Sequence, residues 1–375
     1  MKPVRSASPY FARQEIRGIT ADLQQILRSG RLILGPYLRR FEQEFAHYTG
    51  VRYAVGVSSC TAALEAVLRF LNIQGREVLV PTNTFVATVN AVIFAGGRPV
   101  FCDIEPDTLA LDPEDMARRL RRSVKAVIAV HVGGTIAPSI ERVQAMCRRR
   151  GIPLIEDASH AHGATFKGRK AGAFGFAGCF SLYPTKVMTT GCGGVVTTNS
   201  SPLAKFCAVI RHHGAGASSL RIPELQGNDW LMDEIGASLG RHQLSRLERH
   251  LAVRNRIAGF YRRELASVPG IRSLPVFAQA RNSYYKYLAV IERRGVDLPR
   301  ALLRASKRHG VEFAQLYFPP CHQQPIFRRW ARGVRLPAAE DLLPRTVALP
   351  VHVGLTRRDV SRVVDAVRKL LEAIR

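Results

Sequence analysis

The chain has 375 residues, 46% of them hydrophobic, which is enough to bury a large core in one or two domains. No stretch reaches the roughly 18 apolar residues of a membrane span, and the first residues lack the apolar centre of a secretory signal. We therefore expect a cytoplasmic protein with no membrane partner. The seven cysteines are scattered singly, so neither a disulfide framework nor a metal site is predicted.

The charge balance is strongly basic, with 55 lysines and arginines against 29 acidic residues and a net charge of +26. Such an excess is typical of proteins that bind polyanions. The arginines, however, stand in short runs along the whole chain, and no nucleic-acid-binding motif accompanies them. We favour a solvated basic surface, followed by attraction of an anionic small substrate, and expect no nucleic-acid partner. A basic nucleic-acid-binding or regulatory protein is the alternative from a different functional class.

Short β-branched runs alternate with helical patterns over the first two thirds of the chain. This alternation predicts an α/β fold with a mostly parallel sheet that is covered on both faces. Helices are expected at 61–71, 112–122 and 139–150, the last with Ser139 as its N-cap. Strands are expected at 53–58, 77–80, 99–104, 125–132, 152–157, 177–182 and 193–198.

The pattern changes after a helical stretch near 232–264. A strand-like run at 284–292 and amphipathic helices at 298–310 and 357–374 indicate a smaller α+β unit. We expect a large domain at 1–250 and a small C-terminal domain at 251–375.

Polar groups gather at the expected carboxyl ends of the strands, where an open α/β sheet binds its ligands. The stretch VSSCTAAL places Cys60 and Thr61 at a helix start, where free backbone N–H groups can hold a phosphate. The stretch LIED brings Asp157 to the end of an apolar run, where a buried carboxylate needs a hydrogen-bonded or cationic partner. An ordinary helix cap is the alternative interpretation of each feature.

A third strand end leads into CFSLYPTK, residues 179–186. Ser181 lies in the strand, and Lys186 lies in the turn that follows. Because desolvation pushes a buried lysine toward its neutral form, Lys186 is a poor structural element but a good amine nucleophile toward an aldehyde.

One cofactor accounts for these three features together. Pyridoxal 5′-phosphate needs a lysine for a Schiff base, a carboxylate to keep its ring nitrogen protonated, and a cradle for its phosphate. Lys186, Asp157 and the Cys60–Thr61 turn are suited to these tasks. The sequence therefore predicts an enzyme that uses pyridoxal phosphate.

The chain also resembles the DegT/DnrJ/EryC1/StrS aminotransferases over residues 30–265, and more weakly to its end. The resemblance lies in motifs such as VPTNTFVATVNAVIFAGG, IEDASHAHGATFKGRKAGAFGFAGCFSLYPTK and TTGCGGVVTT. It implies fold type I of the pyridoxal-phosphate-dependent transferases and an obligate homodimer.

The resemblance implies that Lys186 carries the cofactor, that Asp157 holds the pyridine nitrogen and that Phe85 stacks on the ring. It places His160 beside the phenolic oxygen of the cofactor. Cofactor-binding roles are likewise implied for Cys60, Thr61, Ser181 and Asn228, and we expect His213, Tyr317 and His322 to contact the substrate.

Two departures from the family motifs concern Cys192 and Asp229. Cys192 stands where the family's G-E-G-G motif has a carboxylate. Asp229 stands where the family has an asparagine that reaches the cofactor phosphate of the partner subunit. Because an aspartate suits a phosphate poorly, we expect the neighbouring Asn228 to make this contact.

By resemblance, the enzyme is a ping-pong aminotransferase that works through an internal aldimine on Lys186. L-Glutamate or L-glutamine is the expected donor, and a keto-sugar, above all a nucleotide-linked one, is the expected acceptor. A keto-cyclitol or another non-nucleotide ketone is the alternative acceptor. The family's dehydratases carry a histidine where this chain has Lys186, which argues against that activity.

Overall fold

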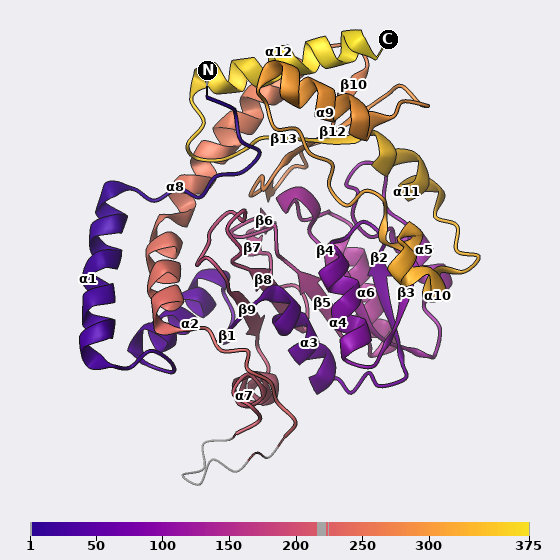
Figure 1. Cartoon of the computed structure of the whole chain (residues 1–375). Helices are drawn as coiled ribbons and strands as arrows, with labels where there is room; N and C mark the ends of the chain where they lie inside the picture. The colour runs from indigo at the N-terminus through magenta and orange to yellow at the C-terminus, as the bar shows by residue number, and fades with distance from the viewer. Residues whose placement is uncertain (1, 216–222, 224, 375) are drawn as a thin grey trace.

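A seven-stranded sheet forms the centre of the computed structural model, which describes residues 2–215, 223 and 225–374 (Figure 1). The strand order is β1-β9-β8-β5-β4-β2-β3, and only β9 runs antiparallel to its neighbours. The predicted α/β fold with a mostly parallel sheet is confirmed. The strands are β1 (Tyr53–Val57), β2 (Glu77–Pro81), β3 (Arg98–Cys102), β4 (Val124–Val130), β5 (Leu154–Asp157), β8 (Ala177–Ser181) and β9 (Gly194–Thr198).

Helices connect the strands and bury their apolar faces against the sheet. Side-chain caps start several of them: Ser59 Oγ, for example, accepts a hydrogen bond from the Ala62 N–H at 3.1 Å. Ser139 occupies the N-cap position of the helix that follows it, as predicted, but its hydroxyl donates to Glu105 and makes no capping hydrogen bond. The helices are α2 (Pro36–Thr49), α3 (Cys60–Phe70), α4 (Val86–Phe94), α5 (Pro113–Arg119), α6 (Ile140–Arg150) and α7 (Ser201–Ile210).

A second, smaller unit follows the long helix α8 (Glu234–Leu265), which runs from the large sheet to this unit (Figure 1). Its antiparallel sheet has the order β10-β12-β13, and two amphipathic helices bury their apolar faces in a separate hydrophobic cluster. The elements are β10 (Ile271–Ser273), β12 (Tyr287–Ile291), β13 (Thr346–Leu349), α9 (Leu298–His309) and α12 (Arg357–Ala373).

The remaining elements pack around these two units. Helix α1 (Arg13–Ser29) contacts α8, and a third small sheet joins β6 (Thr165–Phe166), β7 (Arg169–Lys170) and β11 (Ala280–Arg281). The short helices are α10 (Arg328–Ala331) and α11 (Pro337–Leu342).

A domain boundary near residue 250, inside α8, remains a proposal. The two halves of α8 support it, because Leu244 packs in the large cluster and Tyr261 in the small one. Two segments cross this boundary: Val4 packs in the small cluster, whereas Phe327 packs in the large one.

None of the helices in the described part of the chain is both long and apolar enough to cross a membrane.

Candidate active site

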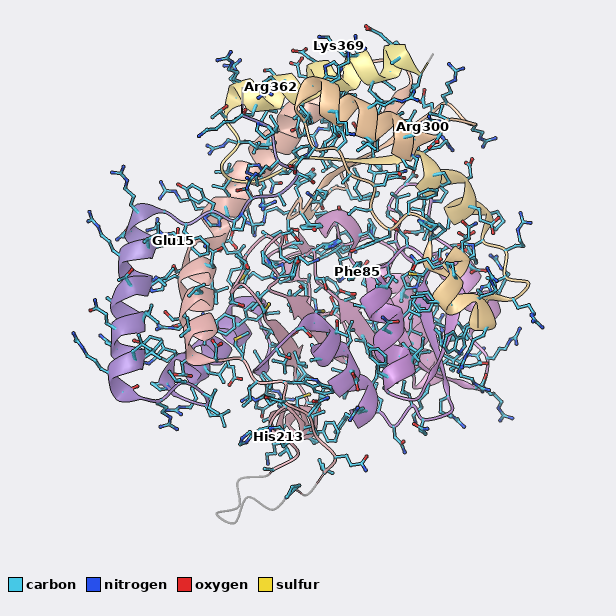
Figure 2. All side chains as sticks on the ribbon, in the orientation of Figure 1. Glu15, Phe85, His213, Arg300, Arg362 and Lys369 are labelled. Atoms are coloured by element: carbon cyan, nitrogen blue, oxygen red, sulfur yellow. The ribbon has the colours of Figure 1, made fainter. Side chains whose placement is uncertain are left out.

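A cavity of about 660 Å³ opens at the carboxyl ends of the central strands. The cavity is also lined by the segment 315–318 and by Tyr285. Phe85, on the rim, lies near the middle of the molecule (Figure 2). Eight of the predicted site residues line this one cavity: Cys60, Thr61, Phe85, Asp157, His160, Ser181, Lys186 and Tyr317.

Asp157, the last residue of β5, lies at the floor of the cavity and is almost fully buried. Thr88 Oγ1 donates to its Oδ2 at 2.7 Å, and the Ser159 N–H donates to its Oδ1 at 3.1 Å. Thr84 Oγ1 lies 2.7 Å from Thr88 Oγ1 and holds that hydroxyl in place. The carboxylate therefore has the partners that a buried charge requires, and it faces the cavity.

Lys186 lies in the turn after β8, and its Nζ is 4.8 Å from the centroid of the Tyr285 ring. Burial lowers the pKa of the Lys186 amine, while the nearby Asp157 carboxylate and Cys60 oppose this shift. A lower pKa increases the fraction of neutral amine at a given pH, which is the form that attacks a carbonyl carbon.

The start of α3 forms the third part of the cavity. Cys60 and Thr61 are its first two residues, and their N–H groups are among those that a helix leaves without an internal partner. A Cβ at Gly194 would lie 2.3 Å from the Ser59 carbonyl carbon, so only glycine lets β9 pass this close. The helix start and Ser181 together can hold an anionic group such as a phosphate.

His160 and two tyrosines form an aromatic stack on the cavity wall. The His160 ring lies 4.0 Å from the Tyr285 ring and 5.6 Å from the Tyr317 ring, nearly parallel to both. Its Nε2 is 2.7 Å from Tyr317 Oη, and the Gly133 N–H donates to its Nδ1 at 3.3 Å. His160 is thus fixed in orientation by groups on both sides.

Two predicted substrate-binding residues lie away from the cavity. His322 is buried: its Nδ1 lies 2.7 Å from Thr82 Oγ1, and its Nε2 lies 3.3 Å from Glu340 Oε1. Both ring nitrogens contact the protein itself, and His322 does not line the cavity, so its expected contact with the substrate stays a prediction. His213 is exposed beside α7, far from Phe85 (Figure 2), so within one chain it cannot contact a ligand in the cavity.

Asn228 lies outside the cavity, in an open hollow that adjoins it. Ser58 and Thr61 line both spaces, and Trp230 lines the hollow beside Asn228. The side-chain oxygen of Asn228 accepts from the Asp229 N–H at 2.9 Å. The expected contact of Asn228 with a partner's cofactor remains a proposal.

Several cavity residues were missed by the sequence analysis. One of them is Tyr285: its ring meets Lys186 and His160, and its hydroxyl lies 3.2 Å from Thr185 Oγ1. The aromatic stretch NSYYKY before β12 was the only local signal of it. Thr88, which supports Asp157, had no signal because it lies inside an apolar helix.

This arrangement suits a cofactor that carries both an aldehyde and a phosphate. Lys186 supplies an amine of lowered pKa, Asp157 a buried carboxylate, and the start of α3 a site for an anion. Among the described residues, no cluster of histidine, cysteine and acidic side chains is suited to hold a metal ion.

Comparison with known proteins shows relatives that match nearly the whole chain. The chain is 32% identical over 378 residues to the spore coat polysaccharide biosynthesis protein SpsC of Bacillus subtilis, covering 97% of this chain and 96% of that protein. It is 31% identical to the GDP-perosamine synthase of Vibrio cholerae, covering 91% and 92% of the two chains. The solved structure of S. venezuelae DesV in complex with a ketimine intermediate has a TM-score of 0.92 and 32% identity, covering 99% of both chains.

Residues 14–368 match the model of the DegT/DnrJ/EryC1/StrS aminotransferase family. The match covers the central sheet, the cavity and most of the small unit. The chain therefore belongs to this family and is a pyridoxal-phosphate-dependent aminotransferase.

Proposed function

We propose that Lys186 carries the pyridoxal phosphate and that Asp157 contacts its ring nitrogen. The observation that supports this assignment most strongly is that the Lys186 amine and the Asp157 carboxylate meet in one cavity. When bound, the cofactor supplies an electron sink for the substrate carbon. Asp157 keeps the ring nitrogen protonated, and the free Lys186 amine moves the proton to and from that carbon.

The remaining cavity residues hold the cofactor in this proposal. The N–H groups at Cys60 and Thr61 and the hydroxyl of Ser181 bind its phosphate, and Phe85 covers its ring. The support is their position on the cavity wall at the start of α3 and the end of β8.

The proposed acceptor is a nucleotide-linked keto-sugar, and the donor is L-glutamate or L-glutamine in a ping-pong reaction. The relative named GDP-perosamine synthase supports a nucleotide-linked sugar, because that name refers to a sugar linked to GDP. The strongly basic composition, with a net charge of +26, suits the diphosphate of such an acceptor.

A half-reaction screen tests this function. The enzyme is loaded as pyridoxamine phosphate and mixed with keto-sugar nucleotides, free keto-sugars and keto-cyclitols. Return of the absorbance of the aldehyde form with the nucleotide-linked compounds alone supports the proposal. Return with keto-cyclitols instead would make the alternative acceptor the correct one.

We also propose a homodimer in which Asn228 reaches the partner's cofactor. The hollow beside Asn228 is lined by Trp230 and by Phe94, whose side chain is 59% exposed, and such aromatic groups are enriched at interfaces. Mixing Asn228→Ala subunits with Lys186→Ala subunits tests this arrangement. In a shared site, each mixed dimer has one site with both changes and one with neither, so activity returns on mixing. No recovery despite verified subunit exchange would contradict it.

A further inference from the structure

The hydrogen bonds of His160 determine which of its ring nitrogens carries hydrogen. A backbone N–H can only donate, so the Gly133 N–H, 3.3 Å from His160 Nδ1, requires that Nδ1 accept. An accepting Nδ1 carries no hydrogen.

The His160 ring is also neutral. Burial lowers its pKa well below the ordinary value, and the charges of Lys186, His162 and Lys286 lower it further. A neutral imidazole whose Nδ1 accepts must carry its hydrogen on Nε2. The Nε2–H therefore donates to Tyr317 Oη, which lies 2.7 Å away.

This direction determines what the Tyr317 hydroxyl can do. Its oxygen accepts from His160, so its own hydrogen points elsewhere. Burial, followed by Asp157 and Tyr285, raises the pKa of Tyr317 well above its ordinary value, so the hydroxyl keeps its hydrogen. Tyr317 lines the cavity, into which this hydrogen can be directed.

The backbone at Tyr317 supports a functional placement. Its φ of +59° lies in the left-handed region, which a bulky residue rarely adopts and which is unfavourable for it. The conformation places the ring parallel to His160 and 6.1 Å from the Phe85 ring at the cavity rim.

We propose that Tyr317 donates a hydrogen bond to an oxygen atom of the ligand in the cavity, and that His160 is the positioning residue that sets this direction. His160 thus acts on the ligand through Tyr317 rather than as a charged group. The identity of the ligand rests on the proposed function; the direction of the hydrogen bonds does not.

Two ligand oxygens have the required chemistry. One is the phenolic oxygen of the cofactor, and the other is a carbonyl or hydroxyl oxygen of the acceptor. Both oxygens can accept a hydrogen bond. Both would belong to molecules bound in the cavity that Tyr317, Lys186 and Phe85 line. Kinetics and absorbance of a Tyr317 variant distinguish these two oxygens.

The first test needs neither cofactor nor substrate. Protein labelled with 15N-histidine is examined by NMR at pH 7, and His160→Gln serves only to assign the signals of His160. We expect a hydrogen-free Nδ1 and a hydrogen-bearing Nε2. A hydrogen on Nδ1, or on both nitrogens, would overturn the proposal.

The second test uses the loaded enzyme and four variants: Tyr317→Phe, His160→Leu, His160→Gln and the double variant Tyr317→Phe/His160→Leu. If the cofactor oxygen accepts, Tyr317→Phe shifts the pH midpoint of the lysine-bound cofactor's absorbance by up to about one unit, the effect of one hydrogen bond. If instead an oxygen of the keto substrate accepts the hydrogen bond, the pH midpoint is unchanged and kcat/KM for that substrate falls about tenfold.

The other variants test whether His160 acts through Tyr317. His160→Leu should give the same change as Tyr317→Phe, and the double variant should be no worse, because the two residues share one effect. The amide of His160→Gln can accept from Gly133 and donate to Tyr317, so it should recover part of the loss. Wild-type enzyme that binds no cofactor would contradict the proposed function. The inference would be contradicted if Tyr317→Phe bound the cofactor normally and changed neither the pH midpoint nor kcat/KM. It would also be contradicted if the effects of Tyr317→Phe and His160→Leu added up in the double variant.

Discussion

Asp157 is the residue whose surroundings define its task most clearly. Two donors, Thr88 Oγ1 and the Ser159 N–H, hold its carboxylate in one orientation toward the cavity. Such preorganised charges stabilise a transition state more than a bound ground state.

Replacing Asp157 with asparagine should lower kcat by about a hundredfold or more, while donor binding changes much less. The reason is that the amide cannot hold the ring nitrogen protonated. Steady-state kinetics with the donor measures both effects. Thr88→Val is the matched control: it keeps the charge and removes one donor, so its loss should be far smaller. Near-normal kcat in Asp157→Asn would mean that the carboxylate only organises the loop after β5.

Most of the strands could be predicted from the sequence, because each is a short apolar run between turn residues. The strand ends then placed Asp157, Ser181 and Lys186 correctly at one edge of the sheet. Tyr285 could not be predicted, since its role depends on contacts with residues about 100 and 125 positions earlier in the chain. The burial of His322 could not be predicted either, because the sequence around a polar side chain gives no local signal of the distant partners that bury it.

The contact between β9 and the start of α3 leads to a prediction for Gly194. Gly194→Ala would place a Cβ against the Ser59 and Cys60 backbone, which must shift and disturb the expected phosphate site. We expect weaker cofactor binding, measured by titration of the apoenzyme, and a lower melting temperature. Gly259→Ala is the control: its Cβ would meet only the tip of Arg263 at 3.8 Å, and alanine favours a helix by about 1 kcal/mol. Unchanged cofactor affinity in Gly194→Ala would argue against a phosphate at this helix start.

At the scale of the whole molecule, burial of neutral histidines makes stability depend on pH. Burial lowers the pKa of His162 to about 3 and that of His352 to about 4. An unfolded histidine has a pKa near 6.5, so below that pH the unfolded chain binds more protons than the folded one. The contribution of His162 and His352 to the free energy of unfolding is fully present above about pH 6.5 and is lost as the pH falls.

The free energy of unfolding should therefore fall between pH 7 and pH 5, with His162 alone accounting for about 2 kcal/mol. Urea unfolding at both pH values measures this change. In His162→Asn the change between the two pH values should be smaller by that amount, whatever the stability of the variant itself. An equal change in both proteins would show that His162 does not titrate with unfolding.

Borohydride reduction followed by peptide mapping identifies the residue that carries the cofactor, which we assign as Lys186. The purified enzyme should be yellow, and reduction should fix the cofactor to the peptide that contains Lys186. Lys186→Ala, treated in the same way, should give no labelled peptide. Reduced cofactor on another lysine of the wild-type enzyme, or none on any peptide, would contradict the account.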